Sequence, residues 1–278
     1  MSAVKLGVNL CKALPLGDTE HLDAIKNAGF DAFFTDSCNR ERSLFWAEEA
    51  AKRGLVLQSF HAPFGSVHKI WQDGDEGEQI LRELEGCVIN AWESGVGIVV
   101  LHPFIGFKDH SPTKIGEERF LRLARLARDK GIRLAFENVE GEEYLEAVMT
   151  MGLTDTVGFC WDSGHEMCYN RGRDRLALYG DRLFATHIND NRGISSPDGE
   201  ISPVDDLHLV PFDGAIDWEE AVSRLKKCGF NGPLMLELKP GNRMGDPAHQ
   251  YYSTLSPQEF YELGAQRGKR LVRMLEKQ

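Results

Sequence analysis

Short apolar runs rich in β-branched and aromatic residues alternate with longer amphipathic stretches from one end of the chain to the other. The apolar runs read KLGVNL, AFFTD, LVLQSFHA, GIVVLHP, RLAFEN, TVGFCWD, LFATHIND and PLMLEL. Apolar residues recur with helical spacing over residues 18–28, 42–53, 76–94, 117–130, 142–151, 173–179, 217–228 and from 256 onward. The pattern predicts eight strands, each followed by a helix.

This alternation constrains the fold class. Near-continuous apolar strands separated by helices are typical of a parallel sheet that helices cover. Eight repeats favour closure into an α/β fold of the (β/α)8 TIM barrel type. An open doubly wound sheet is disfavoured, because polar residues follow nearly every strand instead of two or three. The 278 residues, 42% of them hydrophobic, can bury one full-size core, so we expect a single domain over residues 1–278.

The overall charge limits the classes of partner. Lys and Arg total 32 against 43 Asp and Glu, which gives a net charge of -11 and weighs against a surface that binds nucleic acid. The start MSAVKLGVNL lacks the features of a secretory signal, and no segment approaches the roughly 20 apolar residues that span a bilayer. We therefore expect a soluble, cytoplasmic protein without a membrane partner.

Metal-binding and acid/base side chains stand at or just past the ends of six predicted strands. They are His61, His102, Glu137, the pair Asp162 and His165, His187, and Glu237. In a barrel of parallel strands, the C-terminal strand ends meet at one rim, where active sites lie. One such residue from each of several strands predicts a metalloenzyme with its site at that rim.

Glu137, Asp162, His187 and Glu237 form a mixed oxygen and nitrogen ligand set. The set suits a divalent metal ion such as Mn²⁺, Zn²⁺, Co²⁺ or Mg²⁺. Such an ion can polarise the carbonyl of a hydroxy-ketone and stabilise the enediolate that forms when the neighbouring C–H proton leaves. Glu137 and Glu237, from the fifth and eighth strands, would face the substrate from different sides as catalytic acid and base. Either acid alone is more typical of a solvated strand end or helix cap.

Five further polar residues are predicted to bind the substrate: His61, His102, His165, Asp206 and His208. The three histidines before Asp206 end strands or directly follow them, where an imidazole can be a ligand or a hydrogen-bond donor. The last two residues form a D-x-H pair in the long connection from Asn191 to Ala215. Long loops on a compact domain are often lids or binding loops, so we expect this one to fold over the site.

Four arginines follow the last three strands and could meet a phosphate or acid group: Arg171, Arg173, Arg192 and Arg243. Taken singly, each is more typical of a solvated charge. The sequence contains no G-x-x-x-x-G-K-[ST] and no strand-linked G-x-G-x-x-G, so nothing in it favours nucleotide binding. The phosphorylation state of the substrate stays open.

Several of these strings together resemble the xylose isomerase-like superfamily of TIM barrels: HAPFG, VVLHP, AFEN, GFCWDSGH, THIND, DDLHLVPFDGAIDW and MLEL. They occur in the same order across essentially the whole chain and are most similar to the sugar phosphate isomerase/epimerase group. W-D-x-G-H and D-x-H-L-x-P-x-x-G-x-I-D-W are the most specific stretches.

The resemblance implies a metal held by Glu137, Asp162, His187 and Glu237. Glu137 and Glu237 also match the acid/base pair of the ketose 3-epimerases, and His165 matches their substrate-contacting histidine. The implied enzyme is a metal-dependent isomerase or epimerase of carbohydrate metabolism. Its substrate would be a small-molecule sugar, sugar phosphate or polyol ketone, which reacts by proton transfer through a metal-bound enediolate.

Other activities stay open. An inosose-type dehydratase would expel a β-hydroxyl with the same metal and base, and a catalytically silent sugar-binding protein would keep the ligands alone. Endonuclease IV, a zinc-dependent abasic-site nuclease of the same superfamily, has a three-zinc site, and all its ligand types are present here in order: His61, His102, Glu137, Asp162, His165, His187, Asp206, His208 and Glu237. The acidic charge and the loops PFGSVHKIW and DSCNRERSLFW disfavour the nuclease. The native metal, the number of ions and a homo-oligomeric state are left open.

Overall fold

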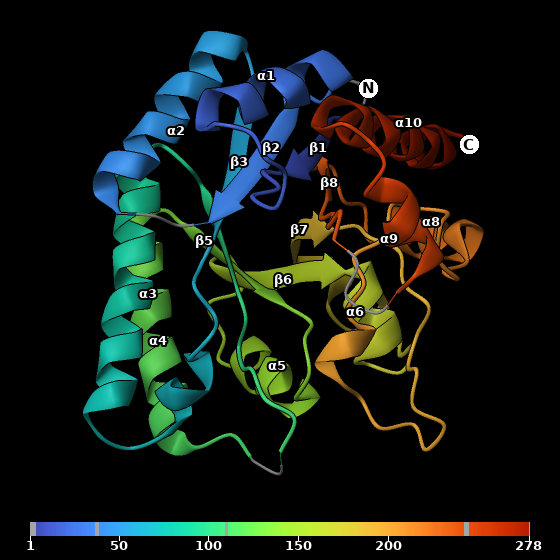
Figure 1. Cartoon of the computed structure of the whole chain (residues 1–278). Coiled ribbons are helices and arrows are strands. Elements are labelled where there is room, and N and C mark those ends of the chain that lie inside the picture. The colour runs from blue at the N-terminus through green and yellow to red at the C-terminus, as the bar shows by residue number, and fades with distance from the viewer. Residues whose placement is uncertain (1–3, 37–38, 109–110, 242–244, 278) are drawn as a thin grey trace.

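The structure is a computed structural model that describes residues 4–36, 39–108, 111–241 and 245–277. Its parallel strands pair in the order β7-β6-β5-β4-β3-β2-β1-β8. They are β1 (Leu6–Asn9), β2 (Ala32–Asp36), β3 (Val56–His61), β4 (Ile98–Leu101), β5 (Arg133–Glu137), β6 (Val157–Asp162), β7 (Leu183–His187) and β8 (Leu234–Leu236). The sheet closes where Ile188, directly after β7, bridges Leu236 of β8. The predicted (β/α)8 barrel is confirmed (Figure 1).

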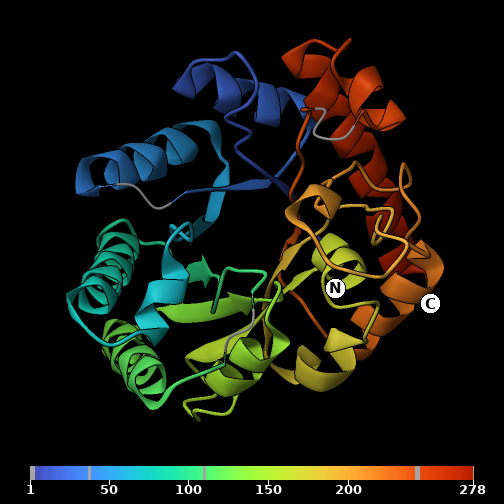
Figure 2. The same ribbon diagram turned by 60° about the horizontal axis from the view of Figure 1, so that its bottom comes forward.

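Helices surround the strands in chain order, as the progression of colour in Figure 2 shows. The longer helices, all predicted from their periodicity, are α1 (Asp18–Ala28), α2 (Arg40–Arg53), α3 (Asp75–Glu93), α4 (Lys114–Lys130), α5 (Glu142–Met149), α8 (Trp218–Lys227) and α10 (Pro257–Glu276). The helix expected over 173–179 is the short α7 (Arg175–Tyr179). Short elements that periodicity did not reveal are η1 (Val67–Trp71), α6 (Ser163–Cys168), η2 (Gly180–Arg182), η3 (Pro203–Asp205) and α9 (Pro247–Tyr252).

Capping residues set the helix boundaries. α2 begins before its predicted start because Asn39 caps it, with its side chain accepting a hydrogen bond of 3.0 Å from Arg42 N. α4 begins early for the same reason, since Thr113 caps its first turn. It ends where the sequence predicts, at Gly131, whose φ of 69° is the left-handed conformation that glycine adopts without strain.

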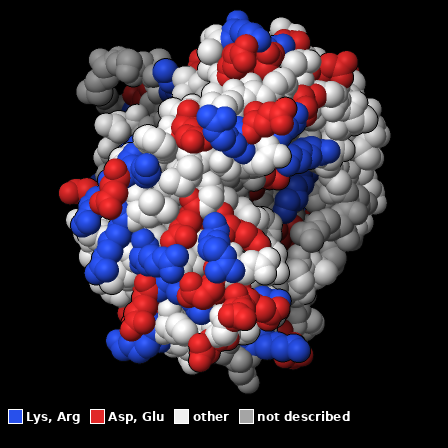
Figure 3. Space-filling view, turned by 90° about the vertical axis from the view of Figure 1, so that its left-hand side faces the viewer, with Lys and Arg blue, Asp and Glu red and all other residues white. Residues whose placement is uncertain are grey.

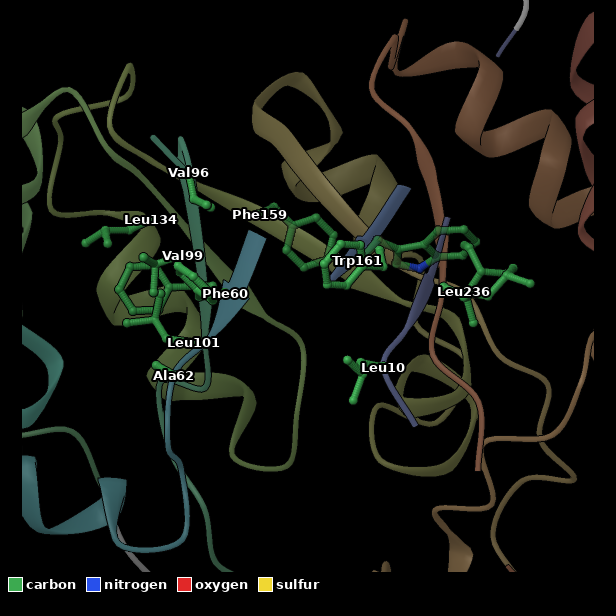
Figure 4. Packing of buried hydrophobic residues seen from close by; sticks show 14 of the residues in the cluster. Leu10, Phe60, Ala62, Val96, Val99, Leu101, Leu134, Phe159, Trp161 and Leu236 are labelled. Carbon is green, nitrogen blue, oxygen red and sulfur yellow. The ribbon is translucent and has the colours of Figure 1, made fainter. Parts of the chain in front are cut away.

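The strands alternate between side chains that pack under the helices and side chains that fill the barrel. The outward row includes Phe60, Val99, Leu101, Leu134, Phe159, Trp161 and Leu236, which Figure 4 labels within the main core. The inward row includes Ile98, Val100, Ala135, Cys160 and Ala185, which form a separate cluster. The two rows follow the two-residue period of a β-strand.

Each predicted site residue at a strand end stands two positions after an inward-facing residue of the same strand. The inward pairs are Ser59 and His61, Val100 and His102, Ala135 and Glu137, Cys160 and Asp162, Ala185 and His187, and Met235 and Glu237. Parallel registry then places Glu137 beside Cys160 and Asp162 beside His187. Mainly apolar residues therefore fill the barrel interior, and metal-binding residue types follow them at the C-terminal rim.

Charges on the helical surface are mixed in sign. Figure 3, on the side that carries α2, α3 and α4, shows Lys and Arg interleaved with Asp and Glu. Some pair between neighbouring elements, such as Arg119 with Glu78 at 2.8 Å. Among the described residues, this face presents no continuous cationic track of the kind that binds nucleic acid. None of the helices in the described ranges is both long and apolar enough to cross a membrane.

Candidate active site

Glu137, Asp162, His187 and Glu237 meet at the rim of the barrel, and we call them the inner cluster. One ligand atom from each lies within 4.8 Å of the others. His187 stands between two of the acids, with its Nδ1 3.0 Å from Glu137 Oε2 and 3.2 Å from Glu237 Oε2. The four residues predicted as metal ligands are therefore neighbours in space, although they come from four different strands or strand ends.

The inner cluster fits a divalent cation. Glu137 and His187 are buried, with 0% and 1% of their surface exposed. Although His187 Nδ1 is 3.0 Å from Glu137 Oε2, no contact of the Glu137 oxygens or of the His187 ring nitrogens has hydrogen-bond geometry among the described residues. Buried polar groups nearly always have a partner of that geometry. A cation would supply the missing partner, and three carboxylates with one imidazole are donors that Mn²⁺, Zn²⁺, Co²⁺ and Mg²⁺ accept.

The electrostatics of the inner cluster favour the same conclusion. Burial by itself would raise the pKa of Glu137, but the facing imidazoles of His187 and His102 hold that pKa well below its usual range. Burial by itself would lower the pKa of His187, but the carboxylates of Glu137 and Glu237 help to hold it well above its usual range. The buried carboxylates thus stabilise a positive charge next to them, and a divalent ion bound there would supply that charge.

His61 and His102 approach the same carboxylate oxygen of Glu137 as His187 does. Their Nε2 atoms are 3.4 and 3.6 Å from Glu137 Oε2, and His61, Glu137 and His187 form a second group of potential ligands. The ring of Phe64 stacks on that of His102, with centroids 4.4 Å apart. Burial lowers the pKa of His102 to about 4, so at neutral pH its imidazole is uncharged and able to act as a ligand or acceptor.

His165, Asp206 and His208 form a third group, which we call the outer cluster. Asp206 Oδ1 lies 3.3 Å from His165 Nε2 and 2.8 Å from His208 Nε2. His165 also connects the two clusters, because its Nδ1 is 3.0 Å from Glu137 Oε1. The D-x-H pair of the long loop therefore lies against the residues of the strand ends. Lys239, which the sequence did not single out, donates to Asp206 Oδ2 at 3.1 Å.

His208 has a backbone conformation that is rare for a residue with a side chain. Its φ is 49°, in the left-handed region that glycine favours. The surrounding backbone holds it there: Lys239 N donates to His208 O at 3.1 Å, and Leu209 exchanges hydrogen bonds with Asp190. Such conformations persist where neighbouring structure enforces them, often at active sites.

Two asparagines orient Asp162, and the sequence reading missed both. Asn138 exchanges two hydrogen bonds of 2.8 Å with the backbone of Asp162, and Asn189 contacts its carboxylate. The other carboxylate oxygen caps α6 by accepting from His165 N at 2.6 Å. Burial raises the pKa of Asp162 to about 6. The available signal was an amide directly after Glu137 and shortly after His187, in FEN and THIND.

Asp190 anchors the long loop and was also missed. Its Oδ2 accepts from Phe212 N at 2.8 Å and from Trp218 Nε1 at 2.9 Å. Its Oδ1 accepts from Ile216 N at 3.1 Å and from Asn191 N at 2.8 Å. One buried carboxylate thereby ties both ends of the loop to the end of β7 and positions the outer cluster.

Three of the four arginines considered for phosphate binding are engaged elsewhere. Arg173 pairs with Glu142 at 2.6 Å, Arg192 pairs with Asp246, and Arg171 donates to the carbonyl oxygen of residue 199. Arg243 lies outside the described residues. These three arginines therefore provide no specific evidence for a phosphorylated substrate.

Proteins with similar sequences include an inosose dehydratase and an inosose isomerase. An inosose dehydratase of Clostridium perfringens is 25% identical over 253 residues, which cover 86% of this chain and 75% of that protein. An inosose isomerase of Bacillus velezensis is 27% identical over 172 residues, covering 58% and 60%. The protein y4fM of Sinorhizobium fredii is 33% identical over 116 residues, covering 39% of this chain and 34% of that protein. The chain thus spans about a third of the last relative and larger shares of the other two.

Solved structures share the barrel. The IolI protein with a binding zinc atom superposes with a TM-score of 0.77 at 19% identity, covering 99% of this chain and 100% of that one. D-psicose 3-epimerase with D-tagatose from Clostridium cellulolyticum has a TM-score of 0.71 at 16% identity, covering 98% and 100%. The family match itself spans residues 22–255. As its motifs predicted, the chain belongs to the xylose isomerase-like TIM barrel family.

Proposed function

We propose that the protein is a divalent-metal-dependent isomerase or epimerase of a sugar, sugar phosphate or polyol ketone. Glu137 and Glu237 are its acid/base pair, and the inner cluster holds the metal. The family supports an enzyme of carbohydrate chemistry, and relatives named inosose isomerase and inosose dehydratase favour a polyol ketone among the substrates to be tested first.

The observation that carries the proposal is the position of His187 between two acids. Glu137 ends β5 and Glu237 directly follows β8, yet both carboxylates approach the same imidazole nitrogen, at 3.0 and 3.2 Å. Two carboxylates that enter one buried site from separate strands can reach opposite faces of a substrate carbon. A carboxylate with only a structural role would instead have its hydrogen bonds satisfied within the protein.

The residues of the chain divide the reaction between them. One residue, as the carboxylate, removes the proton from the carbon next to the carbonyl, and the other, as the carboxylic acid, donates its proton to the resulting enediolate. When bound, a divalent ion at the inner cluster would polarise the carbonyl and offset the developing negative charge. His61, His102 and the outer cluster bind the hydroxyl groups.

Phe64 supplies an apolar wall to the same site. Its ring stacks on His102 and is 42% exposed. An exposed aromatic face beside polar groups suits the C–H face of a sugar, while the histidines bind its hydroxyls.

The test is a turnover screen of ketoses and inososes, with and without phosphate, in D₂O with added Mn²⁺, Co²⁺, Zn²⁺ or Mg²⁺. An epimerase or isomerase that uses proton transfer incorporates solvent deuterium at the carbon next to the carbonyl. Turnover without deuterium would indicate a hydride shift and would contradict Glu137 and Glu237 as the acid/base pair.

A dehydratase is the second candidate, favoured by the inosose dehydratase of C. perfringens, which matches over 86% of this chain. In that reaction one carboxylate removes the proton, and a protonated β-hydroxyl leaves as water. The product is lighter than the substrate by one water, so mass spectrometry of the same reactions separates the two candidates.

The nuclease alternative has one observation in its favour: the three groups of potential ligands adjoin one another. The net charge of -11 and the mixed charges of Figure 3 weigh against it. Incubation with a duplex that contains one abasic site tests it directly, because a nuclease would nick that strand.

A further inference from the structure

Lys239 lies just beyond β8 and reaches the outer cluster. Its Nζ is 3.1 Å from Asp206 Oδ2, while Oδ1 of the same carboxylate faces His208 Nε2 at 2.8 Å and His165 Nε2 at 3.3 Å. Lys239 follows Glu237 by two residues, in the segment directly after β8. An ammonium group and two imidazoles therefore surround the carboxylate of Asp206.

The backbone that carries the ammonium group is held in place. Lys239 N donates to His208 O at 3.1 Å, which holds the long loop against the segment after β8. The Asp206 side chain is 10% exposed and that of Lys239 is 40% exposed, so the lysine approaches the buried carboxylate from the solvent side. A charge-assisted hydrogen bond of this kind compensates a buried carboxylate without a metal ion.

We propose that Lys239 is the resident cation of the outer cluster and prevents a divalent ion from binding to His165, Asp206 and His208. This inference rests on the proposed metal-dependent function and goes beyond it, because it names the residue that limits the number of ions. A divalent ion held by Asp206 would stand beside an ammonium group that lies 3.1 Å from Oδ2 of the same carboxylate, and like charges repel in a partly buried site.

An outer cluster without its own ion remains available to the substrate. His208 Nδ1 is 3.6 Å from Glu237 Oε2, and His165 Nδ1 is 3.0 Å from Glu137 Oε1. The two imidazoles therefore lie beside the proposed acid/base pair. A carbohydrate hydroxyl that binds them would replace the contacts of their Nδ1 atoms with Asn138 O at 3.1 Å and Glu237 O at 3.3 Å. Lys239 thereby favours carbohydrate chemistry over chemistry that needs three metal ions.

The test is the number of ions that the full chain retains. The wild type, Lys239→Met and Lys239→Arg are saturated with Zn²⁺, separated from loose metal by gel filtration and analysed by elemental mass spectrometry. Methionine keeps an unbranched side chain without the charge, whereas arginine keeps the charge. We expect the wild type and Lys239→Arg to retain the same number of ions, no more than two. Lys239→Met should retain about one more per chain.

A second substitution assigns the additional ion. In Lys239→Met/His208→Gln it should be lost, because the outer cluster then lacks one ligand. Three ions in the wild type, or equal counts in the wild type and Lys239→Met, would overturn the inference and leave the metal-dependent function standing. A wild type that retains no ion would refute that function and the inference with it. Lys239→Gln replaces Lys239→Met if circular dichroism shows the latter to be unfolded.

Discussion

Asn189 donates a hydrogen bond of 2.8 Å from its side-chain amide to Oδ2 of Asp162. Both residues are buried, so the bond sets the direction in which the carboxylate presents its lone pairs to the inner cluster. We expect Asn189→Ala to weaken metal binding by about 10- to 100-fold, as is typical when a partner of a metal ligand is removed. Competition titration with a chelating dye measures the loss. Asn27→Ala, on the exposed surface of α1, is the control and should bind like the wild type.

Gly164 tests the same contact by steric means. A Cβ atom at this position would lie 1.9 Å from Asn189 Oδ1, so Gly164→Ala must displace the asparagine from Asp162. We expect metal affinity to fall about as far as in Asn189→Ala. Unchanged affinity would show that the orientation of Asp162 does not depend on Asn189.

The control for this glycine is Gly86→Ala in α3, where the added Cβ would meet no atom within 4 Å. This change should raise the free energy of unfolding by about 0.5–1 kcal/mol, because alanine loses less conformational entropy than glycine in a helix. Urea denaturation measures the free energy of unfolding of Gly164→Ala and of Gly86→Ala.

Glu237→Gln separates proton transfer from substrate binding. An amide cannot accept or return the proton, so we expect the rate constant for turnover to fall by roughly 100- to 10,000-fold. Sugar binding, measured by calorimetry, should change far less. Glu118→Gln on the exposed face of α4 is the matched control. Full activity in Glu237→Gln would rule out Glu237 as acid or base.

Removal of the metal should destabilise the fold. Ligands at about 1,000 times their Kd add about 4 kcal/mol to the free energy of unfolding, which corresponds to roughly 10 °C in the melting midpoint of a protein of this size. We therefore expect EDTA to lower the midpoint by about that amount and added Zn²⁺ or Mn²⁺ to restore it. His187→Ala should melt at the same temperature with and without EDTA if the inner cluster is the site.

Asp190 has a predictable effect on stability. Asp190→Ala would leave three backbone amides and the indole N–H of Trp218 without their acceptor. Each buried unsatisfied group costs about 1–3 kcal/mol, so we expect a loss of more than about 3 kcal/mol in urea denaturation. Trp218→Phe removes only the indole donor and leaves Asp190 with its backbone donors. It should therefore lower the free energy of unfolding by less than Asp190→Ala does. Asp198→Ala, exposed in the same loop, should leave the free energy of unfolding unchanged.

The fold and the inner cluster follow from local patterns. Strands and long helices repeat with periods that the sequence displays directly, and Glu137 continues the inward row two residues after Ala135. Since the strands are parallel, residues that end them must meet at one rim. The sequence therefore predicted which residues gather there, with no knowledge of their distances.

The contacts between strand ends and loops could not be predicted in this way. The bond between Lys239 and Asp206 depends on the path of a loop in which His208 has a φ of 49°. No periodic signal encodes such a path. α6 and α9 have six residues each, fewer than two helical turns, so their sequences contain too few positions to reveal a period.

The closing seam of the barrel has a consequence for how the protein acquires its ion. On one side β8 pairs with β1, from the opposite end of the chain. On its other side, Leu236 of β8 bridges Ile188, directly after β7. Contacts of such large sequence separation form slowly during folding. His187 and Glu237 flank this seam, so a chain that has not yet docked β8 lacks part of the inner cluster. Under the metal-dependent function proposed above, we therefore expect ion uptake to follow the docking of β8 and to report completed folding.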